Sequence, residues 1–135
     1  TAVFALERLS EGRLLVGRQH PGPPEASSIV RLDAQARFDA SFRARLNGNV
    51  LDLRRTRTGD LLVGGSFTQV NGNPQTGHAR LKADGSLSPD NVALPISCCV
   101  RRVLERRDGE ALVAGIFGVD CPLRKTHLLL KAIFR

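Results

Sequence analysis

The amino-acid sequence predicts an all-β fold made from three copies of one strand-rich unit. Three similar stretches, GRLLVG, GDLLVG and GEALVAG, begin at Gly12, Gly59 and Gly109, which are 47 and 50 residues apart. Each glycine follows a polar residue and precedes an apolar run, as expected for a tight turn leading into a strand. No segment keeps the i, i+3, i+4, i+7 apolar spacing of an amphipathic helix, so we expect none.

The residues around these stretches keep the same register. A valine lies nine residues before each of the three glycines, and a leucine or valine lies six before it. Further along the chain, Leu32, Leu81 and Leu130 are spaced by 49 residues and again by 49. Agreement at three registers with a common period indicates an internal repeat.

The strands of one unit are clearest in the middle of the chain. Residues 49–55 predict a first strand, 61–67 a second and 78–83 a third, with polar-glycine turns after the first and the third. A weaker fourth strand is expected at 86–91, with its counterpart at 38–46 in the first unit.

The second strand of the unit is apolar without interruption, which is typical of a strand buried on both faces. Short strands that repeat about every 50 residues and are covered on both sides predict the blades of a β-propeller. On this view Gly64 and Gly65 end the strand where the chain turns away, and Gly64 also admits a neighbouring backbone. Phe67 and Phe117 then pack over the blade edge.

We therefore predict a partial β-propeller of about three antiparallel blades with three to four strands each. Residues 1–135 form one incomplete repeat domain, with units at about 1–48, 49–98 and 99–135, the last one truncated. Closed propellers need about four blades. We expect a fragment of a longer chain, because this one starts without Met and stops within a repeat, so that further blades come from the same chain. The alternatives are that copies of the chain assemble into a ring or that a partner supplies the missing blades.

The stretch GDLLVGGSFTQVNG followed by HARLKADGSL, residues 59–72 and 78–87, resembles the bacterial delta-60 repeat, a β-propeller family present in many copies per chain. The first unit departs from the pattern, with Arg18 in place of the second glycine and Gln35-Ala36 in place of Asp-Gly. The resemblance implies a propeller scaffold without enzymatic residues, and it favours a secreted or cell-surface location. The sequence itself does not define the compartment.

The net charge of +7 comes from 17 Arg and 3 Lys against 13 acidic residues. An anionic partner is one explanation, and an arginine-rich solvated surface is the other, which we favour. Nucleic acid is not expected, because the six Phe lie mostly in apolar strand contexts and no binding motif accompanies the basic residues. No apolar run reaches the ~18 residues of a membrane span.

Cysteine and histidine spacing does not predict a metal centre or a cofactor. Cys98 and Cys99 are adjacent and Cys121 stands alone, so an oxidising compartment would allow one bridge to Cys121, and three free thiols are the simpler expectation. His78 and His127 occupy equivalent registers three residues before Leu81 and Leu130. They would share a metal or a proton, or simply repeat a packing position, and we favour packing.

The long loops between the second and third strands, residues 18–27, 68–77 and 118–126, vary in composition while the strands repeat. In a propeller such loops gather on one face, where binding residues are expected. The candidate binding residues are His20, Asn71, Asn73, Arg124 and Lys125.

The function predicted from these features is a non-enzymatic scaffold that contacts protein or glycan partners, with no catalytic, cofactor or metal residues. One alternative is a propeller hydrolase or lyase segment, whose site would use polar residues facing the channel from the first strands: Asp52, Arg54, Arg102 and Glu105. A second alternative is an anion-binding module.

Overall fold

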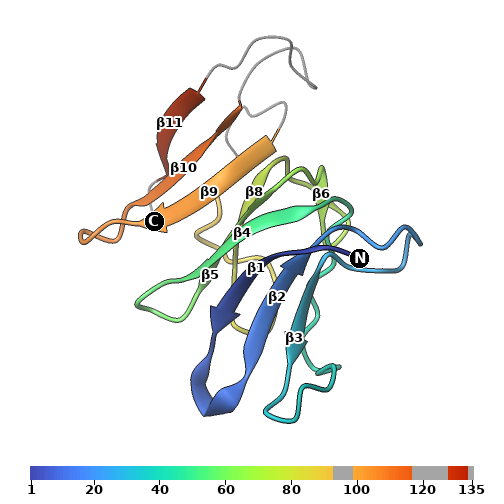
Figure 1. The fold of residues 1–135 in the computed structure, drawn as a ribbon. Helices are drawn as coiled ribbons and strands as arrows, with labels where there is room; N and C mark the ends of the chain where they lie inside the picture. The colour runs from blue at the N-terminus through green and yellow to red at the C-terminus, as the bar shows by residue number, and fades with distance from the viewer. Residues whose placement is uncertain (93–98, 117–127, 134–135) are drawn as a thin grey trace.

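Three antiparallel sheets of three strands each carry the fold (Figure 1). They are seen in a computed structural model that describes residues 1–92, 99–116 and 128–133. The first sheet holds β1 (Val3–Arg8), β2 (Leu14–Arg18) and β3 (Ile29–Leu32); the second holds β4 (Val50–Arg55), β5 (Leu61–Gly65) and β8 (His78–Leu81); the third holds β9 (Cys99–Glu105), β10 (Ala111–Ile116) and β11 (Leu128–Ile133). A short hairpin, β6 (Gln69–Val70) and β7 (Asn73–Pro74), and a 3-10 turn at Ser10–Gly12 complete the elements of the described residues.

The three sheets repeat one register. In each sheet the middle strand, β2, β5 or β10, pairs with the strand before it and the strand after it. Each first strand also carries a bulge at the same place, one residue after its first valine: between Val3 and Ala5, between Val50 and Asp52, and between Val100 and Arg102. The sheets are therefore copies of one structural unit, and we call them the first, second and third blade.

The turn glycines behave as the sequence predicts. Gly12, Gly59 and Gly109 have φ values of 76°, 92° and 84°, a region that residues with a side chain rarely adopt. In the second blade the turn is closed by the Thr56 amide donating to the Asp60 carbonyl at 2.8 Å. Gly85, between the third strand and the following segment, has a φ of 94°.

The blades stack through their first strands. Strands β1, β4 and β9 lie beside one another, and each later one packs against the middle strand of the blade before it (Figure 1). At the first junction Val50 lies against Gly17, and at the second Val100 and Val103 lie against Gly64. This radial stacking of like sheets is a partial β-propeller.

The two junctions hold the hydrophobic core. A larger cluster joins the first and second blades and includes Leu15, Leu53 and the fully buried Phe67. A smaller cluster joins the second and third blades around Leu62 and Val103. The double-sided burial of β5, in which all five residues are buried, confirms the reading of its uninterrupted apolar run. Phe117 lies outside the described residues.

The fourth strand differs from the sequence prediction. The segments at 38–46 and 86–91 do not form strands; each makes one bridge to its own blade, Leu32 with Phe38 and Leu81 with Leu87. The reason is that the first segment turns to the next blade instead: the Arg43 amide donates to the Asp84 carbonyl at 2.9 Å. The described blades thus have three strands.

Gly64 and Gly65 are required for different reasons. A Cβ added to Gly64 would lie 2.8 Å from Val100 Cγ1, a side-chain atom of the next blade. A Cβ added to Gly65 would collide with the Asn49 carbonyl oxygen of its own blade. A side chain can shift to make room, whereas the backbone of a paired strand cannot shift without breaking its ladder.

We therefore predict that Gly65→Ala destabilises the protein more than Gly64→Ala does. Overpacking against a side chain costs about 1–3 kcal/mol, and the backbone collision at Gly65 exceeds that range. The free energy of unfolding in urea measures both. Val100→Ala, combined with Gly64→Ala, should recover part of the loss but should recover nothing when combined with Gly65→Ala. Equal losses for the two glycine variants would contradict this assignment.

Ala36 occupies the turn position that Gly85 holds in the second blade, and it has a left-handed φ of 62°. A residue with a Cβ in this region is strained by about 1–2 kcal/mol relative to glycine. We expect Ala36→Gly to raise the free energy of unfolding by about 1 kcal/mol. Ala34→Gly is the control, since Ala34 is exposed and is not among the residues with positive φ; it should give no gain.

Candidate functional site

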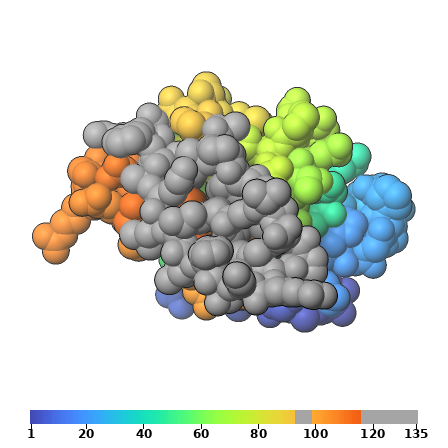
Figure 2. All heavy atoms as spheres, turned by 90° about the horizontal axis from the view of Figure 1, so that it is seen from above, coloured from blue at the N-terminus to red at the C-terminus, as the bar shows by residue number. Residues whose placement is uncertain are grey.

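A groove of about 490 Å³ lies on the loop face of the molecule. Its walls come from three segments: the β2–β3 loop (Pro24), the segment that leaves the first blade (Arg43, Arg45 and Asn47), and the β6–β7 hairpin of the second blade (Gln69, Asn71 and Gly72). Figure 2 shows the loop around residue 20 and the loop around residue 70, in light blue and light green, on the same side of the molecule. The groove therefore joins two loops of consecutive blades.

Asn71 positions one wall of the groove. It begins an Asn-Gly turn in which both residues have positive φ, 52° for Asn71 and 82° for Gly72, as two-residue hairpins require. Its side-chain oxygen accepts from the Arg45 amide at 2.7 Å, and its side-chain nitrogen donates to the Gly85 carbonyl at 3.1 Å. Asn71 thus links the segment from the first blade to the second blade, and both polar atoms of its side chain are engaged in hydrogen bonds within the protein.

Asn47 positions the opposite wall. Its side-chain oxygen accepts from the backbone amides of Thr68 and Gln69, both at 2.9 Å, and its nitrogen donates to the Thr68 hydroxyl at 2.9 Å. The two asparagines together hold the hairpin against the segment from the first blade. The shape of the groove is therefore set by the hydrogen bonds of these two asparagines.

Arg43 and Arg45 supply the charge of the groove. They alternate with the buried Ala44 and Leu46 along an extended segment, so both side chains point outward on the same face. Alternate residues of an extended chain lie roughly 7 Å apart. Neither guanidinium forms an ion pair or a hydrogen bond within the part of the chain that the structure describes.

Other arginines of the blades are structural. Arg31 and Arg80 hold equivalent positions in β3 and β8, and each is largely buried beside a carboxylate, Asp39 at 2.9 Å and Asp60 at 2.8 Å. Hydrogen bonds from Ser41, and then the Arg31 guanidinium, lower the pKa of Asp39 to about 2. Arg31 also donates to the Ala83 carbonyl at 2.9 Å and so ties the first blade to the second.

His20 braces its own loop. Its Nδ1 accepts from the Gly22 amide at 3.1 Å, and its Nε2 lies 3.2 Å from the Ala26 carbonyl. The imidazole is therefore engaged within residues 20–26 and does not line the groove. Asn73 is exposed in β7, next to the groove. Arg124 and Lys125 lie outside the described residues.

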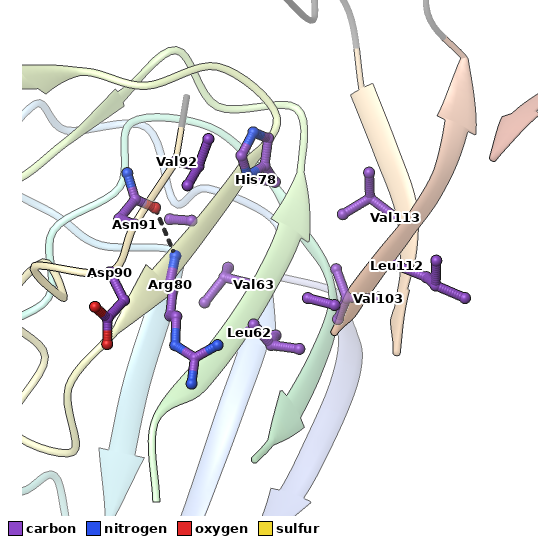
Figure 3. A pocket seen from close by; sticks show the side chains of 12 residues that line it. Leu62, Val63, His78, Arg80, Asp90, Asn91, Val92, Val103, Leu112 and Val113 are labelled. Carbon is purple, nitrogen blue, oxygen red and sulfur yellow. Dashed lines mark hydrogen bonds between the residues drawn. The ribbon is translucent and has the colours of Figure 1, made fainter. Parts of the chain in front are cut away.

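A second hollow lies between the second and third blades (Figure 3). Apolar side chains such as Val63, Val103 and Val113 line it, with Arg80 and Asn91 at one edge, where the Asn91 oxygen accepts from the Arg80 amide at 2.9 Å. Its volume is about 10 Å³, which is about the space of one water molecule. The hollow is a gap in the junction between blades rather than a ligand site.

His78 borders this hollow (Figure 3) and is 2% exposed. Burial lowers the pKa of its imidazole to about 4, so the ring is neutral at physiological pH. Its backbone carbonyl accepts from the Gln75 side chain at 2.8 Å. His127 lies outside the described residues, which leaves the pairing of the two histidines a prediction.

The polar residues expected to face a channel join neighbouring blades or lie at the surface. Asp52 is buried and accepts from the Val103 amide of the third blade at 3.0 Å. Glu105 accepts from the Arg57 amide of the second blade at 3.0 Å. Arg54 and Arg102 are exposed. Within the described residues, no three His, Cys, Asp or Glu side chains gather in a way that could hold a metal ion.

Cys99 is half-buried, and Cys98 and Cys121 lie outside the described residues. The prediction about the cysteine pairing therefore remains untested. Within the same described ranges, no helix has the length and apolar character needed to cross a bilayer.

The sequence pattern does not reveal the arginine pair. It predicts that residues 38–46 form a weak fourth strand of the first blade. The alternation of Arg43, Arg45 and Asn47 with apolar residues does signal a segment with one solvated face. What it does not show is that this segment crosses to the next blade.

Residues 57–89 match the model of one protein family, described as a domain of unknown function (DUF5122) beta-propeller. The matched stretch runs from the turn before β5 to the segment after β8, and so covers most of the second blade. Searches of curated proteins and of solved structures return no match. The family match and the three stacked sheets agree that the chain carries β-propeller repeats.

The buried histidine gives a stability test. The His78 pKa falls from 6.5 in the unfolded chain to about 4 in the folded protein, so the unfolded chain binds the extra proton between these values. The contribution of the neutral His78 ring to the free energy of unfolding is fully present above pH 6.5. It is lost as the pH drops toward 4, by on the order of a few kcal/mol. Urea midpoints measured from pH 7 to pH 4.5 should show this fall.

His78→Gln removes the titrating group and should flatten that profile, whereas His20→Gln should leave the fall in place. A wild-type midpoint that stays constant between pH 7 and pH 4.5 would show that His78 is not buried as a neutral ring.

Proposed function

We propose that this chain is a non-enzymatic β-propeller repeat scaffold that binds protein or glycan partners through its loop face. The observation that carries the proposal is the groove between the loops of the first and second blades. Its walls are fixed by Asn47 and Asn71, and it presents two guanidinium groups without a protein partner among the described residues. Bacterial delta-60 repeats, which the second blade resembles in sequence, are the relatives that we propose for it.

The non-enzymatic assignment is supported by how the acidic residues are used. Asp39 and Asp60 pair with buried arginines, and Asp52 accepts from the neighbouring blade. A general acid or base needs a carboxylate that can meet a substrate, and these three are engaged by the scaffold. The loops, in contrast, carry side chains that face solvent.

The second candidate function, binding of anions, is favoured by Arg43 and Arg45. A guanidinium presents five N–H donors and binds carboxylate or sulfate in a bidentate manner. Two such groups on one face suit a partner with repeated acidic groups, such as an acidic glycan or an acidic stretch of protein. The amides of Asn47 and Gln69 lie beside them and can meet hydroxyl or carbonyl groups.

The test uses heparin, polygalacturonate and poly-glutamate as anionic probes and dextran as the neutral one. We expect binding to at least one anionic probe and none to dextran. Arg43→Gln with Arg45→Gln should weaken that binding by roughly tenfold for each guanidinium removed, the range of a charged hydrogen bond. Affinity measured by calorimetry at fixed salt gives the comparison.

The matched control is Arg101→Gln with Arg107→Gln. Both side chains are exposed in the third blade, and neither makes an ion pair within the described ranges, so this variant loses the same two charges at another place. Equal weakening by the two double variants would mean that only net charge matters, and would show that the groove is not the binding site. Absence of binding to every anionic probe would refute the anion-binding candidate.

A further inference from the structure

The first blade leaves one apolar face open. In β1, Val3 is 56% exposed and Leu6 is 61% exposed, although large apolar side chains in strands are usually covered. Leu6 pairs with Val16 across the sheet, and Val16 pairs with Val30, so these three side chains lie on the same face. No described residue covers Val3 and Leu6.

The same registers are buried in the two blades that follow. Val3 and Leu6 correspond to the valine and the leucine or valine at the start of β4 and β9, and there the exposed fractions are between 0% and 3%: Val50, Leu53, Val100 and Val103. In both cases the cover is the preceding blade. The open face of the first blade thus carries the same apolar residue types that are buried against a preceding blade in the second and third blades.

The partner surface for these valines is a residue without a large side chain. Val50 packs on Gly17, and Val100 packs on Gly64. The register of β10 with β9 places Ala114 at the equivalent position of the third blade, since Ala114 pairs with Arg102 as Gly64 pairs with Asp52. Alanine is the next smallest residue; its Cβ would meet the methyl groups of an incoming valine, as a Cβ at Gly64 would meet Val100, so that valine side chain must shift to fit.

The face of the third blade that carries Ala114 is also open. Leu104, which pairs with Leu112 on that face, is 53% exposed, and Leu112 and Ala114 are half-buried. The described part of the chain therefore ends in two unlike apolar faces. One carries the projecting Val3 and Leu6, and the other carries the small residue that receives such a pair.

We propose that two copies of this chain associate head to tail, with the open face of the first blade of each copy packed on the open face of the third blade of the other. Each contact repeats the junction that already joins the blades within one chain. Two copies of three blades give six blades, which falls within the range of about four to eight found in closed propellers. A ring of this kind leaves neither face exposed.

A head-to-tail contact follows from the shapes of the two faces. If two first blades met face to face, the projecting valines and leucines would oppose one another with no small residue to receive them. Heterologous contacts between unlike faces close into a ring when the rotation allows it. The proposal is independent of the loop groove, because no groove residue lies on either open face.

The first measurement is the mass of the 135-residue chain in solution, by light scattering after gel filtration. We expect twice the chain mass of 14.7 kDa. Leu6→Asp places a charge on the projecting face, and Ala114→Leu fills the position that receives it. Both side chains are at least partly exposed in one chain, so each variant should fold, with an unchanged circular dichroism spectrum, and should have the mass of one chain.

Mixing the two variants provides the decisive control. Leu6→Asp chains keep an intact Ala114, and Ala114→Leu chains keep an intact Leu6, so one of the two contacts is restored in the mixture. We expect a heterodimer in the mixture and monomers in each variant alone. Lys82→Asp, at an exposed residue just after β8 in the second blade, which has neither open face, serves as the surface control and should stay dimeric.

Three results would overturn the proposal. A wild-type chain that stays monomeric over the concentration range would show that the two faces do not meet. A dimer that survives Ala114→Leu but not Leu6→Asp would indicate a face-to-face contact of first blades. A mass that grows with concentration beyond two copies would show an open filament or coverage by further blades instead of a closed pair.

Discussion

The close contact between a valine of one blade and a glycine of the preceding blade is the constraint on which the fold depends. Each first strand must approach the middle strand of its neighbour closely enough for Val50 to touch Gly17 and Val100 to touch Gly64. A methyl group at either glycine would force the facing valine to shift, and a larger side chain would push the sheets apart and reduce the dispersion contacts of the junction. The apolar burial of both core clusters therefore depends on a small residue at this position.

Polar groups are arranged around these junctions so that they connect blades. Asp52 reaches the Val103 amide, Arg31 reaches the Ala83 carbonyl and Asn71 reaches the segment of the first blade. Within the described residues, every buried side-chain nitrogen or oxygen has a partner. A buried polar group without one would cost about 1–3 kcal/mol, so these bonds favour the observed order of the blades.

The parts of the fold that could be predicted from the sequence are those that depend on local pattern. Turn glycines such as Gly59 require positive φ wherever they occur, and the unbroken apolar run of β5 indicates burial on both faces. The path of residues 38–46 could not be predicted, because it depends on bonds to the next blade, such as Arg43 to the Asp84 carbonyl.

The candidate site was predictable in part for the same reason. Asn71 was expected on a binding loop, and the structure shows that its side chain is used to brace the loop. His20 was expected there as well, and its ring is held by Gly22 and Ala26. The guanidinium pair could not be predicted, because no local pattern reveals that two segments about 25 residues apart form one groove.

The uniform junction also bears on how such a chain can change during evolution. Because the apolar part of the contact needs little more than a valine on one strand and a small residue on the next, duplication of one unit creates a new boundary of the same apolar kind. The number of units can therefore grow by duplication before polar contacts specific to particular blades arise. The first blade has Ala5 at the position that Asp52 holds in the second blade. Asp52 adds a hydrogen bond to the Val103 amide that is specific to the boundary between the second and third blades.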